Sequence, residues 1–166
     1  MSEKSVLIFA VDDSEHSFYA LEWTLDHYFS SPSTSIFKLV IIHAKSNAYA
    51  ACAVGMAGPG RIDVLTLIET DIKRGAEKVI EKASELCKRK GVTNVSYEVY
   101  EGDARNVICD AVDKHHASLL VMGSHGYGAF KRAVLGSVSD YCSHHANCSV
   151  MIVKNKAKPQ ISNKQH

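Results

Sequence analysis

The sequence predicts an α/β fold in which a five-stranded parallel sheet, with strand order 3-2-1-4-5, carries helices on both faces. Five short segments with strand character alternate along the chain with four segments of helical periodicity. Four of the five short segments are continuous apolar runs, as expected of strands that are buried on both faces. Right-handed crossovers between successive strands then require a parallel sheet between two helical layers.

The third strand differs from the others because its polar and apolar residues alternate, which places it at one edge of the sheet. The last strand lies at the other edge by its position in the chain. This arrangement is Rossmann-like. The predicted strands, in chain order, are Ser5–Val11, Phe37–Ala44, Val95–Glu101, Ser118–Met122 and Ser149–Val153.

Apolar residues at spacings of three and four predict the helices. The first helix follows Asp13 or Ser14, either of which can cap its first turn. The second is the longest and ends at Gly91. Asp103 caps the third, a short helix. The first, second and last predicted helices span Ser14–Ser30, Asp63–Lys90 and Ser137–Ala146. The apolar stripe of the second helix comprises Leu65, Ile68, Ile72, Ala76, Val79, Ala83 and Leu86.

Composition indicates one soluble domain over residues 1–154, followed by a disordered polar tail over residues 155–166. The chain has 166 residues, of which 46% are hydrophobic and 22% are charged. Lys45–Gly60 is rich in Ala, Gly and Ser and is predicted to be a flexible loop.

The net charge is +1, but residues 154–166 hold four of the lysines, so residues 1–153 carry fifteen basic against eighteen acidic side chains. No nucleic-acid-binding face is therefore expected. No apolar run is long enough for a membrane helix, and the N-terminal residues do not resemble a secretion signal. Five cysteines without a CxxC pair suit reduced thiols, so a cytoplasmic or nuclear location is expected.

Two segments of this sheet are candidates for a ligand site. Ligands of open parallel sheets bind beyond the carboxyl ends of the strands, where the strand order reverses. Asp12-Asp13 follows the first strand, and Gly123-Ser124-His125-Gly126 follows the fourth. Gly136-Ser137 begins the last helix nine residues after Gly126.

The glycines and the start of the last helix together describe a phosphate-binding loop. Glycines let backbone N–H groups approach an anion, and a helix N-terminus adds unpaired donors. The Ser137 hydroxyl is expected to cap this helix and to donate to a phosphate oxygen, with Lys131 and Arg132 as counter-charges. On spacing alone, the alternative that these glycines only form turns stays equally open.

Several other kinds of site are excluded by what the sequence lacks. No GK[ST] follows the glycines, and no GxGxxG follows the first strand. Adjacent histidines at His115-His116 and His144-His145 point about 100° apart on a helix, so a metal site is not expected. No nucleophile, base and orienting residue can be assembled, and no catalytic residues are assigned.

The glycine pattern also matches the signature of a known family. Gly123, Gly126, Gly136 and Ser137 fit the motif G-x2-G-x9-G-[ST], and the chain therefore resembles the universal stress proteins of the ATP-binding type. The likeness extends from Ser5 to Lys154 and includes the acid that ends the first strand and the His43-Ala44 end of the second.

The resemblance implies a nucleotide site position by position. Asp12 would meet the ribose, with Ala10 and Val11 beside it. Asp13 departs from the family pattern, since many relatives carry a small residue there, and it is interpreted as a cap or as an indirect Mg²⁺ contact. Ala44 would recognise adenine through its backbone, and Met122 and Gly123 would lie along the ribose. The phosphates would lie against Gly126, Tyr127, Gly128, Ala129, Gly136, Ser137, Val138 and Ser139. The implied ligand is ATP, ADP or AMP, with or without Mg²⁺.

The expected function is that of a nucleotide-dependent regulatory or protective module of the stress response. Two alternatives stay open: a slow Mg²⁺-dependent ATPase or nucleotidyl-transfer enzyme, and a chaperone-like interaction module that uses the loop Tyr49–Gly60. The apolar last strand is an exposed edge, and both this feature and the resemblance imply a homodimer. The pairing residues would be Ser149, Val150, Met151, Ile152 and Val153.

Overall fold

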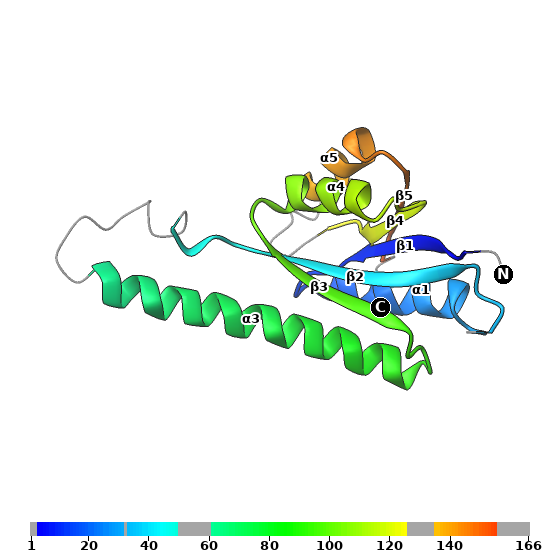
Figure 1. Ribbon diagram of the computed structural model, residues 1–166, viewed down its shortest axis with the longest axis horizontal. Coiled ribbons are helices and arrows are strands. Elements are labelled where there is room, and N and C mark those ends of the chain that lie inside the picture. The colour runs from blue at the N-terminus through cyan, green and yellow to red at the C-terminus, as the bar shows by residue number, and fades with distance from the viewer. Residues whose placement is uncertain (1–2, 32, 50–60, 126–134, 156–166) are drawn as a thin grey trace, which may run out of the picture.

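Five parallel strands form one sheet in the order β3-β2-β1-β4-β5, which confirms the predicted fold class and strand order. The computed structural model describes residues 3–31, 33–49, 61–125 and 135–155 (Figure 1). The described elements are β1 (Ser5–Ala10), α1 (Glu15–Tyr28), β2 (Phe37–Lys45), α3 (Arg61–Arg89), β3 (Val95–Glu101), α4 (Ala104–Lys114), β4 (Leu119–Gly123), α5 (Ser137–His145) and β5 (Ser149–Val153).

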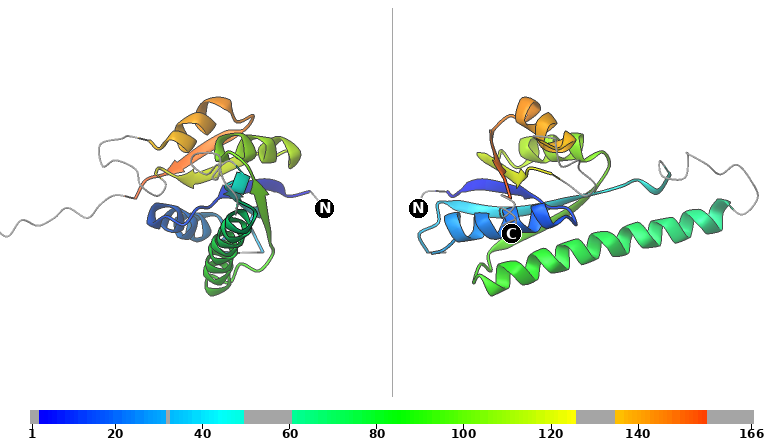
Figure 2. Two further views of the ribbon diagram at one scale, coloured as in Figure 1. Left: turned by 90° about the vertical axis from the view of Figure 1, so that its left-hand side faces the viewer. Right: turned by 180° about the vertical axis from the view of Figure 1, so that it is seen from behind.

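Helices cover both faces of the sheet, and each face has its own core (Figures 1 and 2). Alternate residues of each strand point to opposite faces. Leu7 and Phe9 of β1 are buried with side chains of α1 and α3, whereas Ile8 is buried with side chains of α4 and α5. The apolar runs are therefore explained by burial on two sides, as the sequence predicts.

The element boundaries agree with the predicted ones to within two residues. β1 ends at Ala10, so Val11 already belongs to the loop that follows it. β2 continues one residue further, to Lys45, and β4 is shifted by one residue to Leu119–Gly123. The predicted loop at 45–60 and tail at 155–166 lie largely outside the described residues.

The predicted ends of three helices are confirmed. Ser14 is the N-cap of α1 and accepts a hydrogen bond from the Ser17 amide. Asp103 caps α4 through the Arg105 amide, and the adjacent Arg105 guanidinium helps to lower the Asp103 pKa to about 2. Gly91 ends α3 with a φ of 73°, and the Val92 amide donates to the Cys87 carbonyl at 2.9 Å.

The apolar stripe of α3 is only partly covered, because the helix is longer than the strands beneath it. Ala76, Val79, Ala83 and Leu86 are buried, but Leu65, Ile68 and Ile72 are half-buried. Figure 1 shows the first half of α3 projecting beyond the sheet, alongside the end of β2. Helical periodicity therefore predicted which face is apolar but not how much of it the sheet covers.

The edge strand β3 is joined to α4 by a polar network. Glu98 accepts hydrogen bonds from Tyr100 and His115, the latter over 2.8 Å, and Lys114 donates to the Tyr100 hydroxyl. Burial tends to raise the Glu98 pKa, but these hydrogen bonds and the nearby cations outweigh it and lower that pKa. The network fastens one edge of the sheet and is satisfied without a ligand.

Candidate functional site

The loops that follow β1 and β4 meet at the carboxyl edge of the sheet, where the strand order reverses. A Cβ on Gly123 would lie 3.0 Å from the carbonyl oxygen of His16 and 3.1 Å from its carbonyl carbon. Glycine is therefore favoured at this position, because the backbone of the first turn of α1 packs directly against the end of β4. The Ser14 hydroxyl oxygen also lies 3.5 Å from the His125 carbonyl oxygen. These contacts bring the two predicted segments into one site.

Asp12 is half-buried at the start of this site, and its carboxylate holds the turn into α1. The Asp12 Oδ1 atom accepts a hydrogen bond from the Ser14 amide at 2.8 Å and another from the Ser14 hydroxyl. The Asp12 amide donates to the Ser17 hydroxyl at 3.0 Å. Among the described residues, no hydrogen bond involves Asp12 Oδ2. One carboxylate oxygen thus fixes the turn, and the other is available for a ligand.

Val11 and the end of β2 form the neighbouring part of the edge. The Val11 amide donates to the Ile42 carbonyl at 2.9 Å, and the Val11 carbonyl lies 2.8 Å from the His43 Nδ1 atom. Both backbone polar groups of Val11 are therefore occupied, and this buried residue can only form the wall of a ligand site.

The backbone of Ala44 faces the β1 side of the sheet. Alternate residues of a strand direct their backbone groups to the same neighbour. The Ile42 carbonyl faces β1, and that of Lys45 faces β3, where it accepts from the Gly102 amide at 3.0 Å. The N–H and C=O of Ala44 therefore face the β1 side, beyond Ala10, which is the last paired residue of β1. This geometry suits recognition of a planar base by a strand backbone.

Ser124, Gly136 and Ser139 join the two ends of the segment between β4 and α5. The Gly136 amide donates to the Ser124 carbonyl at 2.7 Å. The buried Ser139 hydroxyl is 3.0 Å from the same carbonyl and 3.1 Å from the Gly136 carbonyl. Ser139 therefore fixes the loop ends with its hydroxyl, which leaves the exposed Ser137 as the better phosphate donor.

The expectation that Ser137 caps α5 is wrong. The N-cap is Gly136, which has extended backbone angles and provides no side-chain cap. Ser137 is the first helical residue, so its amide belongs to the unpaired donors of the first turn. Val138 is half-buried beside it, and Met122 and Ala10 belong to the core under the site.

The middle of the predicted phosphate loop lies outside the described residues. Gly126, Tyr127, Gly128 and Ala129 fall there, together with the expected counter-charges Lys131 and Arg132. The site can therefore be built from its two ends only: Asp12, Gly123 and His125 on one side, and Gly136 and Ser137 on the other.

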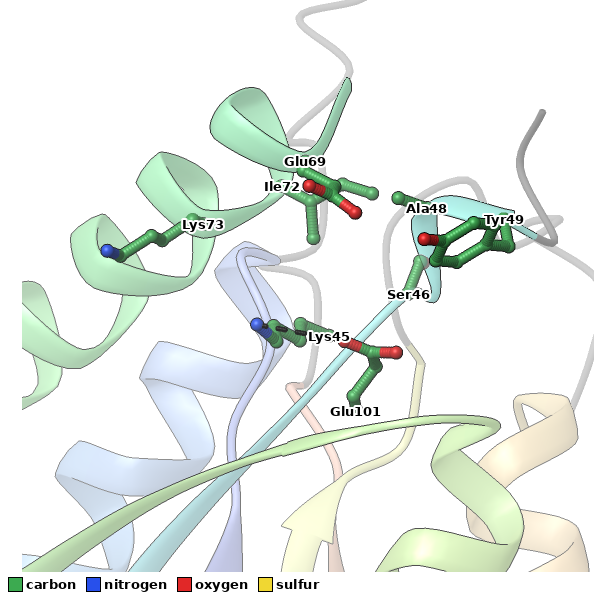
Figure 3. Close-up of a pocket in the computed structure, with 8 residues that line it drawn as sticks. All are labelled: Lys45, Ser46, Ala48, Tyr49, Glu69, Ile72, Lys73 and Glu101. Atoms are coloured by element: carbon green, nitrogen blue, oxygen red, sulfur yellow. Dashed lines mark ion pairs between the residues drawn. The ribbon is translucent and has the colours of Figure 1, made fainter. Parts of the chain in front are cut away.

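A separate pocket of about 240 Å³ lies between the end of β2 and the projecting half of α3 (Figure 3). Lys45 and Glu101 form an ion pair across 3.9 Å at its base, and Glu101 also accepts a hydrogen bond from Asn47. This pocket could not be predicted from the sequence, because its formation depends on how far α3 extends past the sheet. Its lining residues are Lys45, Ser46, Ala48, Tyr49, Glu69, Ile72, Lys73 and Glu101.

Neither a membrane span nor a metal cluster is found within the described ranges. No described helix is long and apolar enough to cross a bilayer. Likewise, no group of three or more His, Cys, Asp or Glu side chains in this part of the chain is arranged to hold a metal ion.

Comparison with known proteins identifies similar chains. The model of the universal stress protein family matches residues 5–154. Universal stress protein PHOS34 of Arabidopsis thaliana is 32% identical over 160 residues, which cover 87% of this chain. The chain spans 60% of the length of that relative. Universal stress protein A-like protein of the same plant is 31% identical over 145 residues, covering 83% of this chain and 78% of the relative.

One solved structure resembles this chain in both fold and sequence. It is a universal stress protein family protein from Arabidopsis thaliana with AMP bound, with a TM-score of 0.66 and 26% identity. The match covers 96% of this chain and 97% of that one.

Proposed function

This chain belongs to the universal stress protein family, and from that premise we propose that it binds an adenine nucleotide where the carboxyl ends of β1 and β4 diverge. The observation that carries the proposal is the close approach of Gly123 to the first turn of α1, which brings the end of β4 next to the helix that follows Asp12. The AMP bound to the similar Arabidopsis protein supports an adenine nucleotide as the ligand class.

Each end of the ligand has a suitable partner in this arrangement. The free Oδ2 atom of Asp12 accepts hydrogen bonds from ribose hydroxyls, and the β1-facing backbone of Ala44 pairs with adenine. The phosphates lie at the N-terminus of α5, where unpaired N–H groups and the helix dipole favour an anion. We propose ATP as the nucleotide, with Mg²⁺ balancing its charge near the acidic Asp12 and Asp13.

The cellular role we propose is a regulatory or protective module of the stress response, acting in the cytoplasm. Family membership supports this role. Nucleotide occupancy would be the signal that the module transmits, because nucleotide binding would join the loops after β1, β2 and β4 through one ligand.

Titration calorimetry with Mg²⁺-ATP tests the site. Wild-type protein, stripped of nucleotide, is expected to bind, whereas Gly136→Val should bind at least about tenfold more weakly, because its methyl groups would stand at the N-cap of α5, where the phosphates are proposed to lie. Gly75→Val is the matched control, since a Cβ at Gly75 meets nothing within 4 Å and α3 contributes no phosphate donor. Equal affinity of wild type and Gly136→Val would place the phosphates elsewhere.

We also propose that two copies pair through β5. This strand is an edge of the sheet, and its central residues Val150, Met151 and Ile152 are half-buried in the single chain. An unpaired apolar edge favours association, and two-fold pairing would close it. Sedimentation at tens of micromolar should give a dimer, and Val150→Lys should shift it to monomer. A monomeric wild-type protein at that concentration would refute the pairing.

A further inference from the structure

Two histidines of the candidate site, His16 and His125, each have one ring nitrogen that lacks a hydrogen-bond partner among the described residues. His16 belongs to the first turn of α1, and His125 follows β4. Their rings meet edge to face, with centroids 5.6 Å apart and an interplanar angle of 73°. The Nδ1 atom of each ring is buried and has no hydrogen-bond partner among the described residues.

A buried Nδ1 atom without a hydrogen-bond partner is unusual among the histidines in the described part of the molecule. The Nδ1 atoms of His27, His43, His144 and His145 each lie 2.7 to 2.9 Å from a backbone carbonyl oxygen. Buried polar atoms without partners cost free energy and are rare in folded proteins. A pair of them at a ligand site indicates that the ligand provides the missing partners.

The position of the two rings identifies which part of a nucleotide they would meet. His125 directly precedes Gly126, the second glycine of the signature, and its carbonyl oxygen lies 3.5 Å from the Ser14 hydroxyl oxygen. His16 is the second residue of α1, where backbone N–H groups lack helical partners and an anion is favoured. Phosphate oxygens accept hydrogen bonds, and a neutral imidazole can donate from Nδ1.

We propose that His16 and His125 donate hydrogen bonds from their Nδ1 atoms to the phosphate chain, so that affinity depends on the number of phosphates. This inference rests on the proposed nucleotide site and adds specificity for phosphorylated ligands to it.

Calorimetric titration of adenosine, AMP, ADP and ATP into wild-type and His16→Phe protein tests the inference. Phenylalanine keeps the edge-to-face packing and removes the nitrogens. His16→Phe should bind adenosine as wild type does and bind ATP about tenfold more weakly, the effect of one lost hydrogen bond to a charged group. His16→Asn should restore most of the ATP affinity, because the asparagine amide nitrogen occupies about the position of Nδ1.

Two controls separate the outcomes. His27→Phe changes a histidine on the same helix whose Nδ1 already contacts the Trp23 carbonyl, so all four affinities should stay unchanged. Thermal unfolding of each variant verifies the fold. Equal ATP affinity of wild type and His16→Phe, or an equal loss for adenosine and ATP, would overturn the role of His16. Failure of wild-type protein to bind all four ligands would instead refute the nucleotide site itself.

Discussion

Gly123→Val is expected to destabilise the protein strongly and to abolish nucleotide binding. The new Cβ would lie 3.0 Å from the His16 carbonyl oxygen and 3.3 Å from the Ser17 amide nitrogen. These neighbours are backbone atoms of a helix, so they cannot move aside as a flexible side chain would. We expect a loss of about 3 kcal/mol in the free energy of unfolding, at the upper end for overpacking, measured by urea denaturation.

Gly75→Ala provides the matched control for this prediction. A Cβ at Gly75 meets nothing within 4 Å, and alanine favours the helix by about 0.5 to 1 kcal/mol over glycine. Gly75→Ala should therefore stabilise the protein slightly and leave ATP affinity unchanged. A Gly123→Val protein with wild-type stability would show that α1 and β4 are not packed as described.

The second large effect is expected at Asp12, where two roles can be separated. Asp12→Ala removes both the acceptor that holds the Ser14 turn and the oxygen available to ribose. We expect a loss of about 1 kcal/mol in the free energy of unfolding and a fall in ATP affinity of tenfold or more, measured by denaturation and calorimetry.

Asp12→Asn and Asp13→Ala make this test specific. Asparagine can still accept hydrogen bonds from Ser14 through Oδ1, so Asp12→Asn should keep nearly wild-type stability. Its ATP affinity should fall, because the negatively charged acceptor for the ribose hydroxyls is lost. Asp13 is exposed beside it and would act only through Mg²⁺, so Asp13→Ala should lose less ATP affinity than Asp12→Asn. If Asp12→Asn binds ATP normally, the carboxylate is needed only for the turn into α1.

The fold could be predicted from the sequence because its main determinants are local. Continuous apolar runs such as Ser5–Val11 indicate burial on both faces, and Ser14, Gly91 and Asp103 mark helix ends through short-range hydrogen bonds. The alternation in Val95–Glu101 correctly placed that strand at an edge. The incomplete burial of Leu65 and Ile68 was not predicted, because it depends on the length of α3 relative to the sheet.

The meeting of the two candidate loops was predictable from the sequence, but their contacts were not. The reversal of strand order pointed to the loops after β1 and β4, since topology alone determines where they meet. The pairing of His16 with His125 joins residues 109 positions apart, and no local pattern reveals it. Ser137 was misassigned as the cap because Gly-Ser fits a helix start in two registers, and only the backbone angles of Gly136 distinguish them.

An NMR titration of assigned backbone amides with ATP tests the central claim most directly. The account predicts that the largest shifts occur at Asp12, Ala44, Gly123 and Ser137, which lie at the carboxyl ends of β1, β2 and β4 and at the start of α5. Shifts confined to the pocket around Tyr49, Glu69 and Ile72, or no shifts at all, would contradict a nucleotide site at the point where the strand order reverses.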